Sequence, residues 1–503
     1  MAVVAALTVT LVAAEPASAT TPAAKKPAAA KTVTSRPDLV SARVTAKAQG
    51  SRVEVESLRD ETSTTWVNPD GTMTTQAHGG PIRYRDDSGA WRDVDLTMAE
   101  AADGTVGPKG HPGRLSLAGA TKAAGGVAKG TDETDLAVAK QGKGKHKQDR
   151  DVTLGWPGGK LGTPVLSGTT ATYKSVKPGV DLVVDARRSG YETHLIINTP
   201  QALAALKVDA KGGPVSWSIP VKTKGLTARA EKDGSVSFVD ADGQVTSHVA
   251  APVAWDAVVD EHSGNRVNES PVTMTVAKKG AGRAVLTLTP DQGWLLDPSR
   301  VFPVTIDPTY AGGGNVGTSF DTYVSSAYST ATYSTATELR VGTYNGGGDK
   351  YRSFLSFPLA SFKGKDITSA SLSLYEFHSW SCTAKPFYVH STAPTSSSTS
   401  WSNQPSPSPT TAWGSASVAK GFSSSCAAGR VSVPITSLID TWSGASASTG
   451  AMRLSASETD SYGWKKFYSV ESSQDPYITF TYNRKPKRGV GADDGGRVHP
   501  VVR

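Results

Sequence analysis

The chain has 503 residues, a length that corresponds to about three domains of average size. It contains 50 Gly and 30 Pro, and only 19% of its residues are charged, which is typical of short strands joined by turns rather than of helices. Half of the formal net charge of +8 comes from the last 20 residues, and no apolar run is long enough to span a membrane, so we expect neither nucleic-acid binding nor a membrane span.

The first 19 residues have the pattern of a secretory signal peptide. An apolar stretch at residues 2–14 is followed by Ala17-Ser18-Ala19, whose small side chains suit the cleavage site. Residues 20–50 are rich in Ala, Pro, Lys and Thr and predict a flexible leader. We therefore expect a secreted or extracellular protein, and association with the cell wall is one of its expected locations.

Residues 51–310 read as a β-rich N-terminal region. The stretch Asn68-Pro69-Asp70-Gly71 predicts a tight turn between two strands at residues 62–67 and 72–76. Similar hairpins are expected at residues 180–198 and 226–239, and Asp242-Gly243 is expected to lead from the second of these into a strand at 244–249. The helix expected here covers residues 201–206. Residues 105–150 hold few large apolar side chains and predict a poorly ordered, low-complexity excursion.

The composition changes near Asn315. Of the 37 aromatic residues in the chain, 25 lie between Asn315 and Asn483, and polar and apolar residues alternate at 371–375, 430–435 and 477–482. Such alternation buries one face of each sheet, so two sheets must pack together. The expected fold class is all-β, with the N-terminal β-rich region followed by a C-terminal β-sandwich of jelly-roll type at residues 315–483.

Two further features complete this segment. A short helix is expected at residues 437–442, capped by Thr436 or Ser437, and residues 484–503 read as a basic, disordered tail. The two cysteines of the chain, Cys382 and Cys426, lie in this one segment. In an exported protein they favour a disulfide over two free thiols or a metal site, which would lack its remaining ligands.

Three stretches of the C-terminal segment resemble the DNRLRE-type domain, a secreted β-sandwich related to carbohydrate-binding modules. They are residues 321–324 (Asp-Thr-Tyr-Val), 339–342 (Leu-Arg-Val-Gly) and 352–357 (Arg-Ser-Phe-Leu-Ser-Phe). Residues 400–405 and the closing pair 467–471 and 476–482 agree with that family. The resemblance implies a β-sandwich of a surface protein.

The first half resembles the region that precedes such domains in Rhs-like or wall-associated proteins of Gram-positive bacteria. The residues that carry this resemblance are 66–71, 91–95, 179–183 and 302–308. It implies an alternative function, in which the chain is the structural N-terminal part of a larger Rhs-like polymorphic-toxin protein.

The nine histidines and the carboxylates show no recognisable catalytic or metal-binding spacing. The sequence contains no His-Glu-x-x-His pattern, no Gly-x-Ser-x-Gly elbow and no phosphate-binding loop. We therefore expect no enzyme, no catalytic residues, no cofactor and no metal centre. A β-sandwich polysaccharide-degrading enzyme and a structural calcium ion held by Asp321, Asp349, Asp460 and Asp475 are the alternatives left open.

Aromatic residues in loop-like sequence are the candidate binding residues. A sugar ring stacks its C–H face against an indole or phenol while polar neighbours bind its hydroxyls. The aromatic residues that lie in Ser-, Asn-, Gly- or Pro-rich stretches are Trp380, Trp401, Trp413, Tyr462 and Trp464. The alternative is that each of these rings covers an end of the sandwich. The leading hypothesis is a non-catalytic protein whose sandwich binds a polysaccharide or cell-wall glycan.

Overall fold

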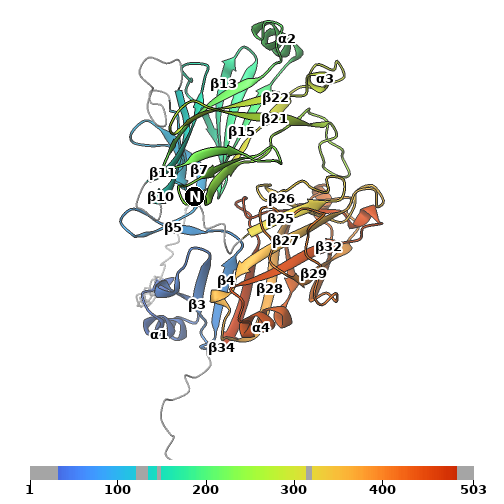
Figure 1. The fold of residues 1–503 in the computed structure, drawn as a ribbon. Coiled ribbons are helices and arrows are strands. Elements are labelled where there is room, and N and C mark those ends of the chain that lie inside the picture. Colours follow the sequence, from blue (N-terminus) through green and yellow to red (C-terminus); the bar gives the residue numbers. More distant parts are fainter. Residues whose placement is uncertain (1–31, 120–133, 144–148, 313–319, 484–503) are drawn as a thin grey trace, which may run out of the picture.

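The computed structural model describes residues 32–119, 134–143, 149–312 and 320–483, and these form two lobes (Figure 1). The upper lobe is built from residues 95–312. The lower lobe combines residues 32–78 with residues 320–483, which lie far apart in the sequence. The expected signal peptide at 1–19 and basic tail at 484–503 lie outside the described residues. No helix among the described residues is long and apolar enough to cross a membrane.

The lower lobe is a β-sandwich of two sheets. The large sheet has the order β1-β2-β3-β4-β34-β28-β33-β26, with β31 paired to β28. Its strands are β1 (Ser35–Arg36), β2 (Val53–Val55), β3 (Ser63–Val67), β4 (Met73–His78), β26 (Glu338–Val341), β28 (Asp366–Ser379), β31 (Gly429–Pro434), β33 (Lys465–Tyr468) and β34 (Tyr477–Asn483). The small sheet has the order β25-β27-β32-β29-β30, formed by β25 (Phe320–Ser325), β27 (Tyr351–Pro358), β29 (Lys385–Thr392), β30 (Gly414–Val418) and β32 (Thr449–Ala456).

Alternating apolar residues of both sheets form the core of this sandwich. Leu372 and Leu374 of β28 face Leu355 of β27 and Leu454 of β32, and all four are fully buried. The helix α4 (Thr436–Gly444) adds Leu438, Ile439 and Trp442 to the same core. The predicted all-β class with a C-terminal β-sandwich is therefore confirmed. The helix has Ile435 at its N-cap with no side-chain cap, so the predicted Thr436 or Ser437 cap is wrong.

Residues 32–78 differ most from the sequence-based expectation. Within the expected flexible leader, α1 (Leu39–Gln49) is an ordered helix: Asp38 caps its N-terminus, and Gly50 closes its C-terminus at φ 69°. Ala42 and Ala46, one turn apart, are fully buried, and their small side chains give no strong apolar period. The next strands β2–β4 join the C-terminal sheet rather than the β-rich N-terminal region, because β4 pairs with β34 along six residues.

In the upper lobe, β7 and β8 (Asp95–Glu100, Val106–Gly110) and the strands that follow pair into a closed barrel (Figure 1). The others are β9 (Ser116–Leu117), β10 (Thr134–Lys143), β11 (Asp149–Trp156), β12 (Val165–Ser167), β13 (Thr170–Lys177), β14 (Val180–Ala186), β15 (Gly190–Ile197), β16 (Trp217–Lys224), β17 (Thr227–Ala230), β18 (Val236–Val239), β19 (Val245–Val249), β20 (Val253–Trp255), β21 (Glu269–Lys278), β22 (Arg283–Pro290), β23 (Val304–Asp307) and β24 (Thr309–Gly312). Two helices, α2 (Pro200–Asp209) and α3 (Gln292–Leu295), flank it, and β5 (Arg83–Arg85) and β6 (Trp91–Asp93) form a separate hairpin. Short 3-10 turns occur at Glu56–Leu58, Leu359–Ser361, Ser424–Cys426 and Ser461–Gly463.

The expected excursion at residues 105–150 contains three of these strands. The short apolar residues Leu136, Ala137 and Ala139 of β10 are buried against the lobe's core, and β10 pairs with β11 along most of its length. The absence of large side chains was therefore a poor guide to disorder here. Residues 120–133 and 144–148 of the excursion lie outside the described part of the chain. The expected hairpins and the helix at 201–206 agree with the structure.

A network of hydrogen bonds joins the two lobes. Arg188, in the β14–β15 turn, donates to the carbonyl of Pro81 at 2.6 Å and to Asp475 Oδ1 at 2.9 Å. The other carboxylate oxygen of Asp475 lies 2.8 Å from His78 Nδ1. Close by, the Ser189 amide donates to Glu471 Oε2 at 3.0 Å. The contact between the lobes is thus charged and specific rather than a flexible linker.

Two buried carboxyl groups at this contact predict a pH dependence of stability. Burial raises the pKa of Asp321 well above its usual range and also raises the pKa of Glu471. The folded state therefore keeps protons that the unfolded chain releases above about pH 4. This contribution is present at low pH and is lost as the pH rises through the folded pKa values.

We therefore expect Asp321→Asn to change the slope of the free energy of unfolding against pH between pH 5 and pH 7 in urea titrations. The variant should lose the decrease that Asp321 contributes, because an amide does not titrate, while its oxygen can still accept the 2.8 Å hydrogen bond from the Val470 amide. The comparison is between the two proteins because the buried His111 and His248, whose pKa values are lowered, contribute a slope of opposite sign to both. An equal slope in the variant would show that Asp321 does not carry the effect.

The predicted disulfide between Cys382 and Cys426 is confirmed. It joins the loop after β28 to the segment before β31, across 44 positions of sequence. Replacing both cysteines with serine should lower the free energy of unfolding by roughly 2–4 kcal/mol, because the unfolded chain regains the entropy of that loop. Chemical denaturation checks this, and unchanged stability would mean that other contacts already fix the loop.

Candidate functional site on the outer face of the small sheet

Strand alternation places polar side chains on the outside of the small sheet. Leu454 of β32 and Val389 of β29 point into the core and are fully buried, so Arg453 and His390 point outward. These two residues are register partners on neighbouring strands. We call the outer surface formed by Arg352, Tyr388, His390 and Arg453 the arginine face.

The loop between β29 and β30, residues 393–413, folds back toward this face. A bridge between Thr392 and Pro407 starts the return, and the Ser402 amide donates to the carbonyl of Ser329 at 2.9 Å. The loop places the Trp401 ring against Arg352, whose guanidinium carbon lies 4.4 Å from the ring centroid. An indole ring, half buried and fixed by a cation–π contact, thus borders the arginine face.

The two arginines of the face have different partners. Arg352 forms a bidentate pair with Glu458 at 2.6 and 3.0 Å and also donates to Gln404 Oε1 at 3.1 Å. Arg453 forms no ion pair within the described residues, and its buried Nε has no hydrogen-bond partner there. Burial, and then the charge of Arg352, lower the pKa of Arg453. An arginine stays charged at physiological pH, and the carboxylate whose charge acts on Arg453, that of Glu458, is already paired with Arg352.

His390 is a neutral hydrogen-bonding group at this face. Its Nδ1 lies 3.1 Å from the Thr410 carbonyl, and its Nε2 lies 3.1 Å from Ser455 Oγ. A carbonyl can only accept, so Nδ1 carries the proton and Nε2 accepts from the serine. Burial, and then the neighbouring Arg453, lower the pKa of His390. With Tyr388 exposed beside it, the face combines a cation, a neutral imidazole and aromatic rings.

The predicted aromatic residues fall into two groups. Trp401 borders the arginine face, and Tyr462 is 46% exposed in the β32–β33 loop that also carries Glu458. Trp413 packs its half-buried ring against the sandwich core, and its Nε1 has no hydrogen-bond partner in the described structure.

Trp380 and Trp464 instead contact the upper lobe. The Trp380 ring stacks on His262 with centroids 4.8 Å apart. Trp464 is fully buried, and its Nε1 donates to the carbonyl of Ser263 at 2.8 Å. The prediction that Trp464 offers a stacking face to a ligand is wrong in this structure, because the ring is fully buried, packed on Tyr344 and Tyr351 and hydrogen-bonded to the upper lobe.

The polar residues of the arginine face were not predicted from the sequence. Tyr388 and His390 alternate with buried residues in β29, as Arg453 does in β32. This alternation was the available signal. What it could not show was that β27, β29 and β32, far apart in the chain, are neighbours in one sheet.

The four carboxylates considered for calcium do not meet. Asp460 pairs with Lys385 at 2.9 Å and Asp475 with Arg188 at 2.9 Å, whereas Asp349 accepts from Tyr344 at 2.6 Å. Asp321 is buried and accepts from the Val470 amide. A calcium site formed by these residues is therefore not supported.

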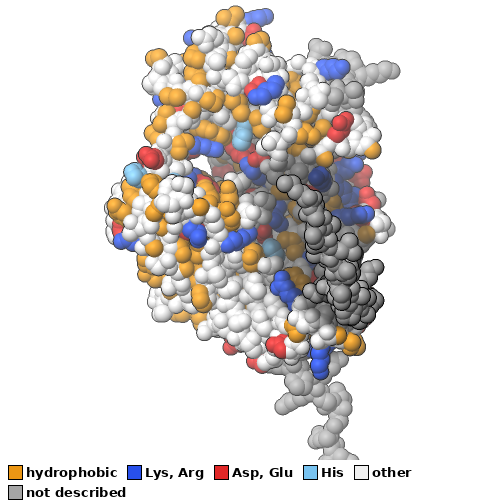
Figure 2. All heavy atoms as spheres, turned by 180° about the vertical axis from the view of Figure 1, so that it is seen from behind, with side chains coloured by type: hydrophobic (Ala, Val, Ile, Leu, Met, Phe, Trp, Pro, Cys, Tyr) orange, Lys and Arg blue, Asp and Glu red, His pale blue; other side chains and the backbone are white. Residues whose placement is uncertain are grey.

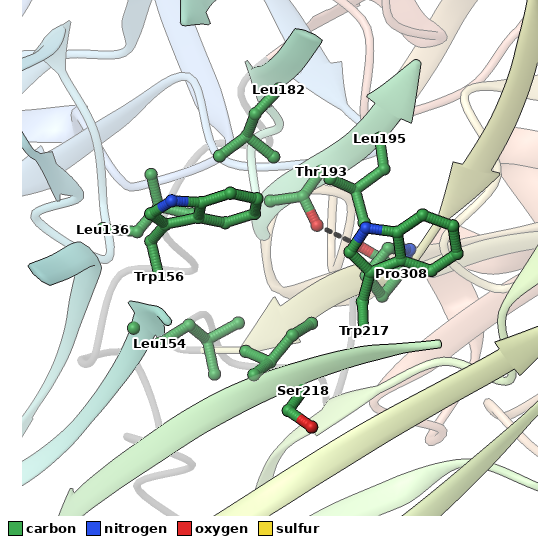
Figure 3. Close-up of a pocket in the computed structure, with 11 residues that line it drawn as sticks. Leu136, Leu154, Trp156, Leu182, Thr193, Leu195, Trp217, Ser218 and Pro308 are labelled. Carbon is green, nitrogen blue, oxygen red and sulfur yellow. Dashed lines mark hydrogen bonds between the residues drawn. The ribbon is translucent and has the colours of Figure 1, made fainter. Parts of the chain in front are cut away.

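Two hollows lie outside the arginine face. A cavity of about 20 Å³ lies inside the upper lobe among Leu136, Trp156, Leu182 and Trp217 (Figure 3). It has room for about one water molecule and none for a sugar ring. A groove of about 490 Å³ lies between α1 and the lower sandwich, lined by Leu39, Leu58, Met73, Lys365 and Tyr482 among others. We call it the N-terminal groove; its volume falls within the range of ligand sites.

Part of the lower lobe matches the model of a known protein family. The family model of carbohydrate-binding module family 96 matches residues 315–482, a segment that includes every residue of the arginine face and only part of the N-terminal groove. The lower lobe thus carries a domain like a carbohydrate-binding module.

Curated relatives match more of the chain. The tRNA nuclease WapA of Bacillus subtilis strain 168 is 24% identical over 457 residues, covering 85% of this chain and 18% of that protein. The tRNA(Glu)-specific nuclease WapA of Bacillus subtilis subsp. natto is 28% identical over 331 residues, covering 62% of this chain and 13% of that protein. The chain thus spans less than a fifth of the length of these relatives.

Solved structures are similar only at a low level. An exo-beta-1,3-galactanase from Phanerochaete chrysosporium covers 80% of this chain and 100% of its own, at 8% identity and a TM-score of 0.14. A structure described for promiscuous carbohydrate-binding modules of the beta-sandwich superfamily covers 52% of this chain and 95% of its own, at 8% identity and a TM-score of 0.13. We draw nothing from similarities at this level.

Proposed function

We propose that the protein is a secreted, non-catalytic surface protein whose lower lobe binds a polysaccharide at the arginine face. The family match supports glycan binding by residues 315–482. The observation that carries the choice of site is Arg453, a half-buried guanidinium that forms no ion pair of its own in the described structure, since the nearby Glu458 is paired with Arg352. A ligand group would supply the partner that this cation lacks.

The chemistry of the face favours a polysaccharide with acidic substituents. A guanidinium binds carboxylate and phosphate groups through paired N–H donors. The exposed ring of Tyr388 and the half-buried ring of Trp401 can stack on the C–H faces of sugars. The face would thus bind the charge at its centre and the sugar rings at its borders.

The test compares Arg453→Ala with the unchanged protein on insoluble neutral and acidic polysaccharides. A hydrogen-bonded charge contributes about 1.5–3 kcal/mol, so the variant should bind an acidic polysaccharide more than 10-fold less tightly. Arg453→Lys should bind at an intermediate level, since it keeps the charge but loses the forked geometry.

Lys365→Ala is the matched control. Lys365 is also a cation beside aromatic rings, with its Nζ 4.2 Å from the Tyr482 centroid, but it lies in the N-terminal groove. It should leave binding unchanged. Loss of binding in this variant, with Arg453→Ala unaffected, would place the ligand in the groove and contradict the proposal. Release of reducing ends or unsaturated products during binding would establish the enzyme alternative.

The WapA relatives support a second, compatible role as part of a larger protein. Most of this chain aligns to less than a fifth of their length, so the nuclease activity in their names does not follow for these residues. We propose that the chain is the structural, glycan-binding part of such an Rhs-like protein. The purified chain should then leave tRNA intact, and cleavage by the chain alone would contradict this role.

A further inference from the structure

A second cluster of ligand-type side chains lies in the upper lobe, away from the arginine face. Glu192 and His194 are two residues apart on β15 and so point to the same side. Asp307, at the end of β23, follows Ile306, which is the register partner of Leu195. One ligand atom from each of Glu192, His194 and Asp307 lies within 4.8 Å of the other two.

The surroundings of this cluster are half-closed. The side chains of Glu192 and His194 are 15% and 19% exposed, and Asp307 is buried. The rings of His194 and Trp255 meet edge to face, with their centroids 5.6 Å apart. Arg266 also stacks on Trp255, with its guanidinium carbon 3.3 Å from the ring centroid. Figure 2 shows that the molecule is hollowed where the two lobes meet, with acidic, basic and histidine side chains around the opening.

Several atoms of the cluster are held as a metal site would hold them. Arg187 pairs with Oε2 of Glu192, and it also pairs with Asp185 at 2.8 Å. The other carboxylate oxygen of Glu192, Oε1, lies 3.2 Å from His194 Nε2. His194 Nε2 is buried, and Glu192 Oε1 is the ligand-type atom that faces it. Thr309 Oγ1 donates to Asp307 Oδ1 at 3.2 Å. Outer hydrogen bonds of this kind orient ligands in metal sites.

The charge of the cluster leaves room for a cation. Arg187 pairs with Asp185 and Glu192, and Arg266 pairs with Glu269 at 3.7 Å, whereas Asp307 forms no ion pair within the described residues.

We propose that Glu192, His194 and Asp307 bind one divalent transition-metal ion, with zinc as the favoured ion. One imidazole nitrogen and two carboxylate oxygens suit zinc, whereas calcium takes six to eight oxygen ligands. Zinc also binds nitrogen–oxygen sites more tightly than manganese or ferrous iron. Three protein ligands leave a coordination position for water or a ligand group.

The test uses the untagged full chain after removal of metals with a chelator. Titration with ZnCl₂ in a calorimeter should show one site that weakens at least 10-fold in His194→Ala and in Asp307→Asn. His390→Ala, which removes a half-buried histidine from the arginine face, should keep that site. CoCl₂ added to the unchanged protein should give visible absorption bands of a nitrogen- and oxygen-coordinated ion, a readout that needs no variant.

The proposal is overturned if the unchanged protein shows neither the calorimetric site nor the cobalt bands. It is also overturned if His194→Ala and Asp307→Asn, both with an unchanged circular-dichroism spectrum, bind zinc as tightly as the unchanged chain. If either variant fails to fold, the other variant and the cobalt spectrum decide.

Discussion

A fragment that begins at residue 79 should lose a large part of its lower-lobe stability compared with a fragment of residues 32–483. In the intact sheet, β4 pairs with β34 along six residues and covers its edge. Met73 and Ala77 of β4 belong to the same buried core as Ile478 and Phe480 of β34. Removing β1–β4 exposes that apolar surface and leaves β34 as an open edge, which favours aggregation.

Urea unfolding and gel filtration of the two fragments check this expectation. The shorter fragment should elute as aggregates or unfold at a markedly lower urea concentration. Equal midpoints and a monomeric elution for both would show that residues 32–78 are dispensable to the sandwich. The isolated segment 315–483 is for the same reason a poor reagent for binding studies.

Trp464→Ala should cost about 3–5 kcal/mol, the range measured when a large buried ring is truncated to alanine. The ring is fully buried and packs edge-on against Tyr351 at 5.0 Å and Tyr344 at 5.5 Å. Its Nε1 also links the lower lobe to Ser263 of the upper lobe. The variant therefore loses both a cluster of ring contacts and a contact between the lobes.

Trp464→Phe is the matched control, since it keeps most of the ring volume but removes the hydrogen bond to Ser263. It should cost clearly less than the alanine variant in chemical denaturation. Full stability of Trp464→Ala together with loss of polysaccharide binding would instead support the sequence-based interpretation of Trp464 as a stacking residue.

Local patterns predicted the local structure well. The Asn68–Gly71 turn, the strand alternation at 371–375 and the disulfide were all readable from neighbouring residues or from two cysteines in one segment. Helix α1 was missed, although Asp38 and Gly50 are recognisable caps, because its buried residues Ala42 and Ala46 are too small to give an apolar period.

Non-local pairing could not be predicted in the same way. Nothing in β4 indicates that its partner is β34, about 400 residues later, or that Trp464 meets a loop of the upper lobe. The candidate site depends on the same kind of information. Arg453 and Arg352 are a hundred residues apart in the chain, and only the order of the small sheet brings them to one face.

The most direct test of glycan binding at the arginine face is a hydrogen-exchange footprint of the full chain with and without a bound acidic polysaccharide. The proposal predicts slower amide exchange in β29, in β32 and in the 393–413 loop, with no change around Leu58 and Tyr482 in the N-terminal groove. Protection confined to the groove, or no protection in the lower lobe with the polysaccharide bound, would contradict it.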